Sequence, residues 1–461
     1  MSLRPALMSA TFRENAFSRI GLAVAISLFG IVSIAHAGDW SARLDSLGVN
    51  QTVFALADDG SGNVIAGGDF TIAGHDTAAR VARFDGNFWT AYGTGIGGTI
   101  RALAVYNGSV VAGGLFLTAG GSSIPYIARW NGSAWVTMGA GLNGPVDALL
   151  VKNGLLYAGG EFTQSGAASM KYIASWNGTS WSSLGTGLGG DCYALTVHNT
   201  ELYAAGDFQT AGGGSAKYVA RWTGSSWAAL GGGLNYIAFS LASFNGSLYV
   251  GGQFSSPGVS VARWNGSAWS ALGNGLDGPV ASMAVYNNSL IIGGSFTTSG
   301  GFGTYNHIAR WNGTSFSTLG SGTTQDVFAL QATGSCLFAG GAFVTAGGKP
   351  SKHIGQWQDV VVGVGDEPFA LALDAPVPSP SRGGMTLSFR LPESSPVRLD
   401  LIDVRGRLVA TLVNGTLSAG PHQATWNGRD AAGGPAASGI YFARLFDGRS
   451  ARVQRLVRLG D

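Results

Sequence analysis

An all-β fold is predicted by three features of this 461-residue sequence. An apolar run that closes on Gly-Gly-x-Phe, as in residues 155–162, occurs seven times, with one Gly→Ala departure at Ala205, at successive intervals of 46, 46, 46, 46, 42 and 47 residues. Asn-Gly pairs recur between short apolar runs, and 75 glycines accompany 11% aromatic residues. A period of this size with several short strands per repeat is typical of a β-propeller. We therefore predict a seven-bladed β-propeller followed by a small C-terminal Ig-like β-sandwich.

Each repeat divides into four short strands. In the third repeat the strands and the two tight turns between them alternate regularly along the chain. Asn-Gly favours a type I′ hairpin turn because both central residues need a positive φ. The predicted strands of this repeat are Val146–Val151, Leu155–Gly160, Tyr172–Trp176 and Trp181–Leu184, with turns at Asn153-Gly154 and Asn177-Gly178. The first position of the doublet is Gly67, Gly113, Gly159, Ala205, Gly251, Gly293 and Gly340.

The two ends of the repeat array predict a closed ring. The seventh repeat stops at Trp357 without a fourth strand. We expect residues 44–48 to supply it, with Leu44 in the place of Trp181 and Leu47 in that of Leu184. A blade shared by both ends of the array would remove two exposed sheet edges.

The N-terminus has the pattern of a secretory signal. Three arginines precede an apolar run at residues 20–34, and Ala35-His36-Ala37 is a small-x-small cleavage site. The expected organisation is a signal peptide at 1–37, the propeller at 38–360, a linker at 361–375 and the C-terminal domain at 376–461. We expect a mature protein without a transmembrane helix that is secreted or held on the outer cell surface.

Charge and cysteine content exclude several classes. A formal net charge of +2 with only 11% charged residues does not favour nucleic acid as a partner. Only Cys192 and Cys336 are present, in repeats that are not neighbours, so we expect two buried free thiols and no disulfide scaffold.

Paired aromatic residues flank the turn between the third and fourth strands. Trp130 and Trp135 form one such pair, within the Arg-Trp-Asn-Gly-Ser-x-Trp motif of residues 129–135. Together with the Gly-Gly doublet, these pairs resemble kelch-type propellers, and the longer motif is similar to repeats of fungal cortical-marker surface proteins. The resemblance covers residues 40–358 and implies the fold, with little about function.

A second β module follows Pro376-Val-Pro-Ser-Pro380. Its expected strands are Met385–Leu391, Val397–Val404, Leu408–Val413, Gln423–Trp426, Tyr441–Phe446 and Ala451–Leu459. The runs at residues 403–412, 418–430 and 438–442 resemble the Ig-like domain of flagellar hook-capping proteins (FlgD). They also resemble the C-terminal sorting domain of type IX secretion cargo in bacteria. That resemblance implies export through secretion machinery, followed by release or surface attachment.

One position per repeat varies while its neighbours stay small or apolar. It lies near the start of the first strand, which lines the channel of a propeller, so the ring of side chains should surround the channel mouth. Aromatic residues beside one Arg and one Asp would suit a sugar or peptide. The alternative is neutral variation with a structural ion pair between Arg101 and Asp147. The ring is Phe54, Arg101, Asp147, Tyr193, Phe239, Ala281 and Phe328; all except Ala281 are predicted to bind ligand.

A second ring of positions precedes the third strand. His75, His307 and His353 fall in blades one, six and seven, which are neighbours in a closed ring. A metal site there is conceivable, but no paired carboxylate motif supports it, so we predict neither a metal nor a cofactor. The positions are Arg80, Tyr126, Tyr172, Tyr218, Ser260, His307 and His353.

Three functional classes remain open. We favour a non-enzymatic protein that binds a carbohydrate or a surface protein. A polysaccharide lyase or hydrolase is the first alternative, disfavoured because no convergent acid and base pair is evident. A structural envelope component, which would self-associate and have no pocket, is the second.

Overall fold

The computed structural model describes residues 38–42, 44–300, 302–359, 371–391, 395–418, 420–447 and 451–460. The predicted signal peptide and most of the predicted linker lie outside these ranges. Within them the chain is built from short strands, and the single helix is α1 (Leu44–Leu47). No helix among the described residues is long and apolar enough to cross a membrane. The all-β prediction is confirmed.

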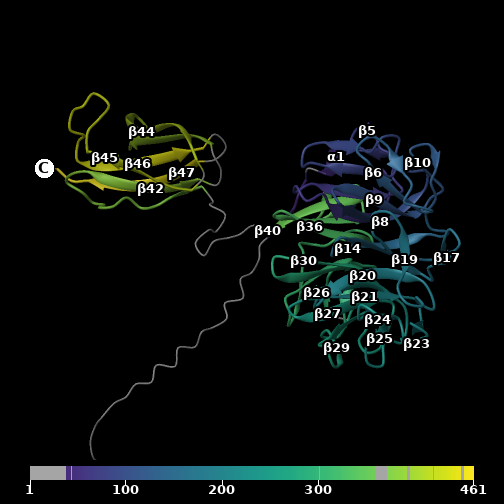
Figure 1. The fold of residues 1–461 in the computed structure, drawn as a ribbon. Helices are drawn as coiled ribbons and strands as arrows, with labels where there is room; N and C mark the ends of the chain where they lie inside the picture. The colour runs from purple at the N-terminus through teal and green to yellow at the C-terminus, as the bar shows by residue number, and fades with distance from the viewer. Residues whose placement is uncertain are drawn as a thin grey trace, which may run out of the picture. The chain divides into compact units, whose positions relative to one another are not determined.

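Residues 38–359 form seven four-stranded antiparallel sheets, which we call blades 1 to 7 (Figure 1). Blade 1 contains β2 (Val53–Asp58), β3 (Val64–Gly68), β6 (Val81–Phe84) and β7 (Trp89–Ala91). Blade 2 contains β8 (Thr99–Tyr106), β9 (Ser109–Leu115), β12 (Ile127–Trp130) and β13 (Trp135–Val136). Blade 3 contains β14 (Val146–Lys152), β15 (Leu155–Gly160), β18 (Ile173–Trp176) and β19 (Trp181–Ser183).

The remaining blades repeat this order. Blade 4 contains β20 (Cys192–His198), β21 (Glu201–Gly206), β24 (Val219–Trp222) and β25 (Trp227–Ala229). Blade 5 contains β26 (Ala238–Phe244), β27 (Ser247–Gly252), β28 (Val261–Trp264) and β29 (Trp269–Ala271). Blade 6 contains β30 (Val280–Tyr286), β31 (Ser289–Gly294), β34 (Ile308–Trp311) and β35 (Phe316–Thr318). Blade 7 contains β36 (Val327–Thr333), β37 (Cys336–Gly341), β40 (Ile354–Asp359) and β1 (Gly38–Trp40).

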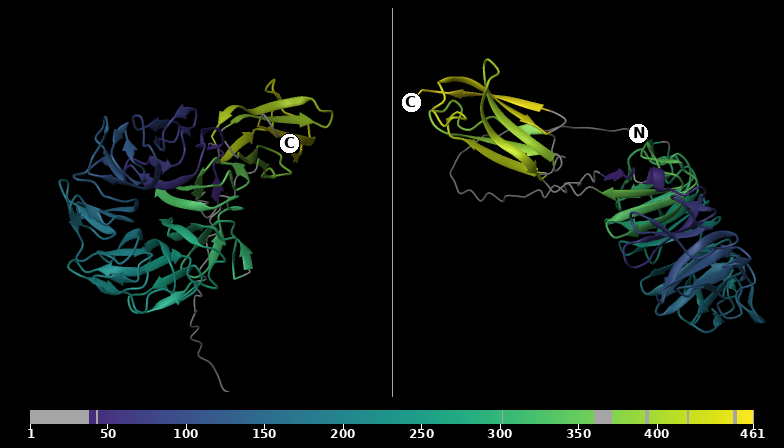
Figure 2. Two further views of the ribbon diagram at one scale, coloured as in Figure 1. Left: turned by 90° about the vertical axis from the view of Figure 1, so that its right-hand side faces the viewer. Right: turned by 90° about the horizontal axis from the view of Figure 1, so that it is seen from above.

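The blades close into a ring around a central axis (Figure 2). The first strand of each blade contacts the first strands of its two neighbours, and β36 contacts β2. These first strands therefore line the channel of a β-propeller.

The strand that completes blade 7 differs from the predicted one. β1, residues 38–40, pairs with β40, and Trp40 lies opposite Trp357 as Trp181 lies opposite Trp176. The prediction that Leu44 takes the place of Trp181 was therefore wrong. Leu47 does match Leu184, because its carbonyl accepts a bond from Trp89 Nε1 as that of Leu184 does from Trp227 Nε1. α1 absorbs the four extra residues between the fourth strand and Leu47.

The Gly-Gly doublet is explained by two close approaches. A Cβ on Gly159 would lie 2.6 Å from Sγ of Cys192 in the next blade, and one on Gly160 would lie 2.1 Å from the carbonyl oxygen of Pro145. The first glycine thus lets neighbouring blades touch, and the second lets the first two strands of one blade touch. Blade 4 has Ala205 at the first position, and the facing residue of blade 5 is Ala238 rather than Val, Ile or Cys. The extra methyl of one blade is offset by a smaller side chain in the next.

Three of the seven Asn-Gly hairpin turns in the repeats have the predicted geometry, namely those that join a first strand to a second. Between the first and second strands, Asn153 and Gly154 have φ values of 50° and 74°, as a type I′ turn requires. Between the third and fourth strands, Asn177 instead accepts bonds at Oδ1 from the backbone N–H groups of Thr179 and Ser180, and only Gly178 has a positive φ. These second turns are Asx turns with four residues between the paired tryptophans.

Six blades carry a small two-stranded hairpin between their second and third strands, which the sequence did not predict. The hairpins are β4 (Ile72–Ala73) with β5 (Asp76–Thr77), β10 (Thr118–Ala119) with β11 (Ser122–Ser123), β16 (Gln164–Ser165) with β17 (Ala168–Ser169), β22 (Thr210–Ala211) with β23 (Gly214–Ser215), β32 (Thr298–Ser299) with β33 (Phe302–Thr304), and β38 (Thr345–Ala346) with β39 (Lys349–Pro350). Blade 5 has none.

The two cysteines are free, as predicted, but only one is buried. Cys192 lies on β20 with no exposed surface, whereas Cys336 on β37 is half-buried. The prediction of two buried thiols was wrong for Cys336, because the start of a second strand lies next to the turn.

The C-terminal module is a separate sandwich of two sheets. One sheet has the order β41-β42-β45 and the other β44-β43-β46-β47, around a core that includes Trp426 and Tyr441. The strands are β41 (Ala372–Leu373), β42 (Met385–Leu391), β43 (Ser395–Asp403), β44 (Leu408–Leu417), β45 (Gly420–Trp426), β46 (Gly439–Phe446) and β47 (Ala451–Arg458). The six strands predicted after Pro380 are all present, with shifted ends.

Candidate functional site at the channel mouth

The predicted ring of variable positions coincides with a β-bulge in every blade. The pairing of the first and second strands skips one residue near the start of each first strand. The skipped residues are Phe54, Arg101, Asp147, Tyr193, Phe239, Ala281 and Phe328. A bulged residue is left out of the ladder, and bulges are common next to functional sites. These side chains can therefore vary without changing the sheet.

The bulges lie toward the face that carries the hairpins. The linker that precedes β2 forms a bridge from Val49 to Ala73 of the blade 1 hairpin, and Ile96 and Ala119 do the same in blade 2. The start of each first strand is therefore at the hairpin face. The bulge ring surrounds the channel at that face, as predicted.

The structure brings four of the ring's aromatic residues together in two pairs. Phe54 of blade 1 lies against Phe328 of blade 7, with ring centroids 5.4 Å apart. Tyr193 of blade 4 lies against Phe239 of blade 5 at 5.9 Å. All four side chains are partly exposed. Because the two pairs come from opposite sides of the ring, a ligand over the mouth could contact an aromatic surface at each end.

Arg101 and Asp147 form the ion pair of the alternative interpretation. Arg101 Nη1 donates to Asp147 Oδ1 at 2.8 Å and to Glu161 Oε1 at 2.8 Å. The Asp147 side chain is only 8% exposed, whereas those of Arg101 and Glu161 are 35% and 40% exposed. Glu161 was absent from the predicted set. Blades 2 and 3 therefore place one cation between two carboxylates at the mouth.

Burial raises the pKa of Asp147 to about 6. The Arg101 guanidinium opposes this rise, but it is shared with Glu161, and the negative charges of Glu161 and Asp191 add to the effect of burial. Asp147 Oδ2 is buried and has no hydrogen-bond partner. This carboxyl is the most perturbed acid at the mouth.

The carboxylate of Asp191 holds the side chain of Tyr193, the ring residue of blade 4, in place. Tyr193 donates its hydroxyl to Asp191 Oδ2 at 3.2 Å. Burial, with the charges of Glu161 and Asp207, raises the pKa of Asp191. Burial and Asp191 likewise raise the pKa of Tyr193, so its hydroxyl stays protonated as a donor at neutral pH. Ala281 of blade 6 has only a methyl side chain, so blade 6 contributes no polar group to the ring.

The second predicted ring is structural. Its seven members, Arg80, Tyr126, Tyr172, Tyr218, Ser260, His307 and His353, all have a positive φ between 61° and 70°. Each donates its backbone N–H to the carbonyl of the Phe in Gly-Gly-x-Phe and accepts a bond from the N–H of the second Gly. The left-handed conformation is uncommon outside Gly and Asn, so these positions fix the loop.

The histidines do not meet at a metal site. His307 Nδ1 lies 3.3 Å from Asp326 Oδ1, and Asp326 Oδ2 accepts a bond from Ser295 Oγ at 2.7 Å. Within the described residues no group of three or more His, Cys, Asp or Glu side chains could hold a metal ion.

The sequence analysis also did not predict a set of polar linker residues on the hairpin face, which we call the polar framework. One residue of the linker before the first strand accepts two backbone hydrogen bonds from the segment after Gly-Gly-x-Phe. Five blades have this residue, namely Asn50, Asn143, Asn235, Asp277 and Thr324. Their shared spacing before the first strand is the signal that could have found them.

Comparison with known proteins identifies the C-terminal module. Residues 375–445 match the family described as the FlgD Ig-like domain. Comparison with curated proteins returns no significant match. The chain therefore carries a FlgD Ig-like domain after an all-β propeller.

Solved structures resemble the chain only distantly. One is PorZ of Porphyromonas gingivalis, described as an essential bacterial surface component of the type-IX secretion system, with 15% identity and a TM-score of 0.43 over 89% of this chain and 59% of PorZ. This chain thus spans about 59% of the PorZ chain. The designed protein Ika8 has 15% identity and a TM-score of 0.43, covering 68% and 99%. An arabinoxylan arabinofuranohydrolase of glycoside hydrolase family 43 from Bacillus subtilis has 12% identity and a TM-score of 0.24, covering 90% and 96%. None is close enough to transfer a function.

Proposed function

We propose that this chain is an exported, non-enzymatic binding protein of the bacterial cell surface, whose propeller mouth recognises a carbohydrate or a surface protein. The bulge ring carries this proposal. It presents the two aromatic pairs, Arg101 and Asp147 at one opening, on backbone positions outside the strand ladders, and Glu161 binds Arg101 there. Aromatic surfaces beside a few oriented polar groups are typical of ligand sites.

The C-terminal module supports the choice of compartment. A FlgD Ig-like domain, together with the leader pattern at residues 1–37, favours export and a role in sorting or attachment. In this proposal the module engages secretion machinery of the type IX kind, and the propeller remains outside the cell. The kelch-type and cortical-marker resemblance of residues 40–358 belongs to the same proposal, since it describes a surface scaffold without assigning chemistry.

A glycan array tests the mouth site directly. The chain from Gly38 to Asp461 would be compared with an Arg101→Ala, Asp147→Ala double variant and with Ala281→Ser as the matched control in the ring. We expect saturable binding that weakens at least tenfold in the double variant and is unchanged in the control. Equal binding by all three proteins would remove the mouth site, and no binding to any glycan would favour a protein ligand.

One observation favours the enzymatic alternative enough to test it. A carboxyl whose pKa is raised to about 6 can act as a general acid near neutral pH, and Asp147 is such a group. Any glycan that binds should therefore be incubated with the protein and assayed for new reducing ends. Cleavage that is lost in Asp147→Asn would replace the binding proposal with a hydrolase or lyase. A glycan recovered intact supports binding alone.

A further inference from the structure

Blade 5 lacks the hairpin that the other six blades carry. Its second and third strands are joined by residues 253–260, whereas residues 207–218 join them in blade 4. The loop is four residues shorter, which also accounts for the interval of 42 residues in the repeat array. The framework beneath it is unchanged, because Asn235 still accepts bonds from the backbone N–H groups of Ser255 and Ser256.

The missing hairpin removes a contact from an aromatic side chain, Trp269, which is half-buried. In blades 1, 2, 4 and 7 a hairpin glycine lies against the fourth-strand tryptophan, with a Cβ on Gly120 placed 3.4 Å from Trp135 and one on Gly212 placed 3.2 Å from Trp227. Blade 5 has no such glycine over Trp269. The indole is held in place nonetheless, because Nε1 donates to the carbonyl of Leu230 at 2.8 Å.

The same deletion removes a backbone donor. In blade 4 the hairpin residue Gly212 donates its N–H to the carbonyl of Gly187, and Gly120 donates to Gly95 in blade 2, both at 2.9 Å. The equivalent carbonyl before blade 5 is that of Gly233, which borders the space where the hairpin would lie. The deletion thus leaves both an apolar surface and a polar group for another molecule to contact.

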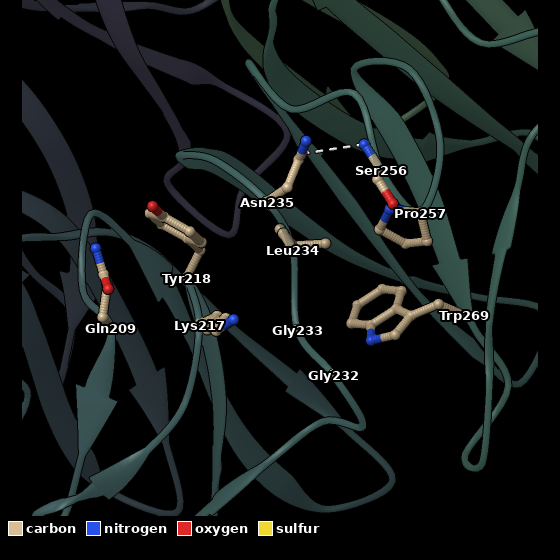
Figure 3. Close-up of a pocket in the computed structure, with 10 residues that line it drawn as sticks. All are labelled: Gln209, Lys217, Tyr218, Gly232, Gly233, Leu234, Asn235, Ser256, Pro257 and Trp269. Carbon is tan, nitrogen blue, oxygen red and sulfur yellow. Dashed lines mark hydrogen bonds between the residues drawn. The ribbon is translucent and has the colours of Figure 1, made fainter.

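The result is a pocket of about 540 Å³ between blades 4 and 5 (Figure 3). Trp269 borders it on one side, and Gln209, Lys217 and Tyr218 of blade 4 border it on the other (Figure 3). Tyr218 is buried and packs against Tyr236 at 6.3 Å, so this wall is fixed. The volume is within the range of small-molecule sites, which combine apolar walls with a few polar groups.

The charges of the pocket select the ligand. Lys217 is exposed, and it makes no ion pair within the described parts of the chain. No carboxylate lines the pocket. An ammonium group without a local anion favours a negatively charged ligand through charge-assisted hydrogen bonds.

We propose that this pocket, which we call the blade 5 notch, binds an acidic sugar residue. The sugar ring lies against Trp269, its carboxylate accepts from Lys217, and its hydroxyls bond to Gln209 and the Gly233 carbonyl. This inference rests on the proposed function only in taking a carbohydrate as the ligand class, and the notch is a different site from the channel mouth. An extended peptide that replaces the missing hairpin is the competing occupant.

The test uses calorimetry with two probes, a trimer of galacturonic acid and its neutral counterpart, a trimer of galactose. The chain from Gly38 to Asp461 should bind the acidic trimer at least tenfold more tightly than the neutral one. Lys217→Glu should abolish that preference. Lys171→Glu is the matched control, because Lys171 holds the same position in blade 3, where the hairpin β16–β17 is present.

A loop graft tests the shape of the notch without changing the charge of Lys217. Residues 255–259 would be replaced by a copy of residues 209–217, which restores a hairpin over Trp269. This variant should fold and lose the acidic trimer. Equal affinity for both trimers, failure of the wild-type chain to bind the acidic one, or binding that survives the graft would each overturn the proposal.

The mouth variant makes the two sites distinguishable. Arg101→Ala, Asp147→Ala should leave binding at the notch unchanged, so a loss there would place the acidic sugar at the mouth. A peptide copy of residues 209–217, which hold the hairpin strands β22 and β23 of blade 4, serves as the probe for the competing occupant. If it binds in place of the trimer and the graft abolishes its binding, the notch is a peptide site and the saccharide assignment fails.

Discussion

Blades 5 and 7 depart from the repeat in opposite ways. Blade 7 lacks its own fourth strand and recovers one from residues 38–40, whereas blade 5 lacks a hairpin and nothing in the described residues replaces it. The lost strand belongs to a ladder whose edge must be paired, while the lost hairpin belongs to a loop on one face. The comparison teaches that this ring conserves its sheets and varies its hairpin face.

The end of blade 7 is held by a buried polar network. Asp359 on β40 has no exposed side-chain surface, pairs with Arg310, and accepts bonds from Asn287 Nδ2 and Trp357 Nε1 at 2.9 and 2.8 Å. Its backbone N–H donates to the hydroxyl of Tyr286 at 3.0 Å. Three of these partners lie in blade 6, so the network joins the last strand to its neighbour.

The largest expected effect comes from breaking this network. Asp359→Asn should lower the free energy of unfolding by about 3–5 kcal/mol, because it leaves the buried Arg310 without its anion. Asp39→Asn is the matched control on the facing strand, since the Asp39 and Lys349 pair is exposed and should contribute about 0–1 kcal/mol. Urea denaturation of the three proteins measures both values. Similar losses in the two variants would mean that blade 7 is not locked there.

The same network predicts a pH effect with a known sign. Burial raises the pKa of Asp359, but hydrogen bonds from Arg310, Asn287 and Trp357 outweigh it and hold the pKa below the ordinary value. The stabilisation is therefore present above the unfolded pKa of about 4 and is lost as the pH falls through the lower folded value. Acid unfolding curves of the wild type should lose this contribution, whereas those of Asp359→Asn should lack it throughout.

The next effect tests the contact between blades 4 and 5. Ala238→Val should lower the free energy of unfolding by about 3 kcal/mol, because the larger side chain meets the methyl group of Ala205. Ala205→Gly should rescue it, since the pair would then match the Gly and Val pairs of other blades. A double-mutant cycle by urea denaturation measures the coupling between the two positions. Additive losses would show that the two alanines do not face each other.

A smaller effect concerns the mouth. Because the folded pKa of Asp147 is raised to about 6, the native state binds a proton that the unfolded state has already released. Stability should fall by about 2 kcal/mol as the pH rises from about 4 to 6. Asp147→Asn should lack this part of the pH dependence. Parallel stability curves for the two proteins between pH 4 and 6 would contradict the assignment.

The smallest expected effect concerns blade 5 and the hairpin that it lacks. The hairpin graft into blade 5 should change the free energy of unfolding by less than about 1 kcal/mol, because lengthening a surface loop by a few residues costs little entropy. Thermal unfolding of the grafted and wild-type chains measures this difference. A large loss would show that blade 5 is shaped by its own core and not only by its short loop.

Most of the propeller could be predicted because close contacts between strands allow only small residues at fixed positions of the repeat. Gly159 and Gly160 recur as a pair because each removes a Cβ that would meet another strand. The closing strand was misassigned because Leu44 and Leu47 fit a strand pattern, although they are the two ends of the four-residue helix α1. Trp40, which lies opposite Trp357, was the better signal.

The mouth was predictable only in part. Its bulge residues stand out in the sequence because a position outside the ladder varies beside positions that cannot. Glu161 was missed because it meets Arg101 across a blade boundary, over 60 residues of sequence. The 42-residue interval indicates a shorter blade 5, but no local pattern in the sequence indicates that Trp269 lacks a hairpin beside it.

The seven bulges also make the ring a ready scaffold for display. Each bulged side chain sits at the rim of one opening, and none takes part in a strand ladder, so all seven could be randomised together while the backbone stays the same. A library built on residues 54, 101, 147, 193, 239, 281 and 328 would sample new binding surfaces without redesigning the fold.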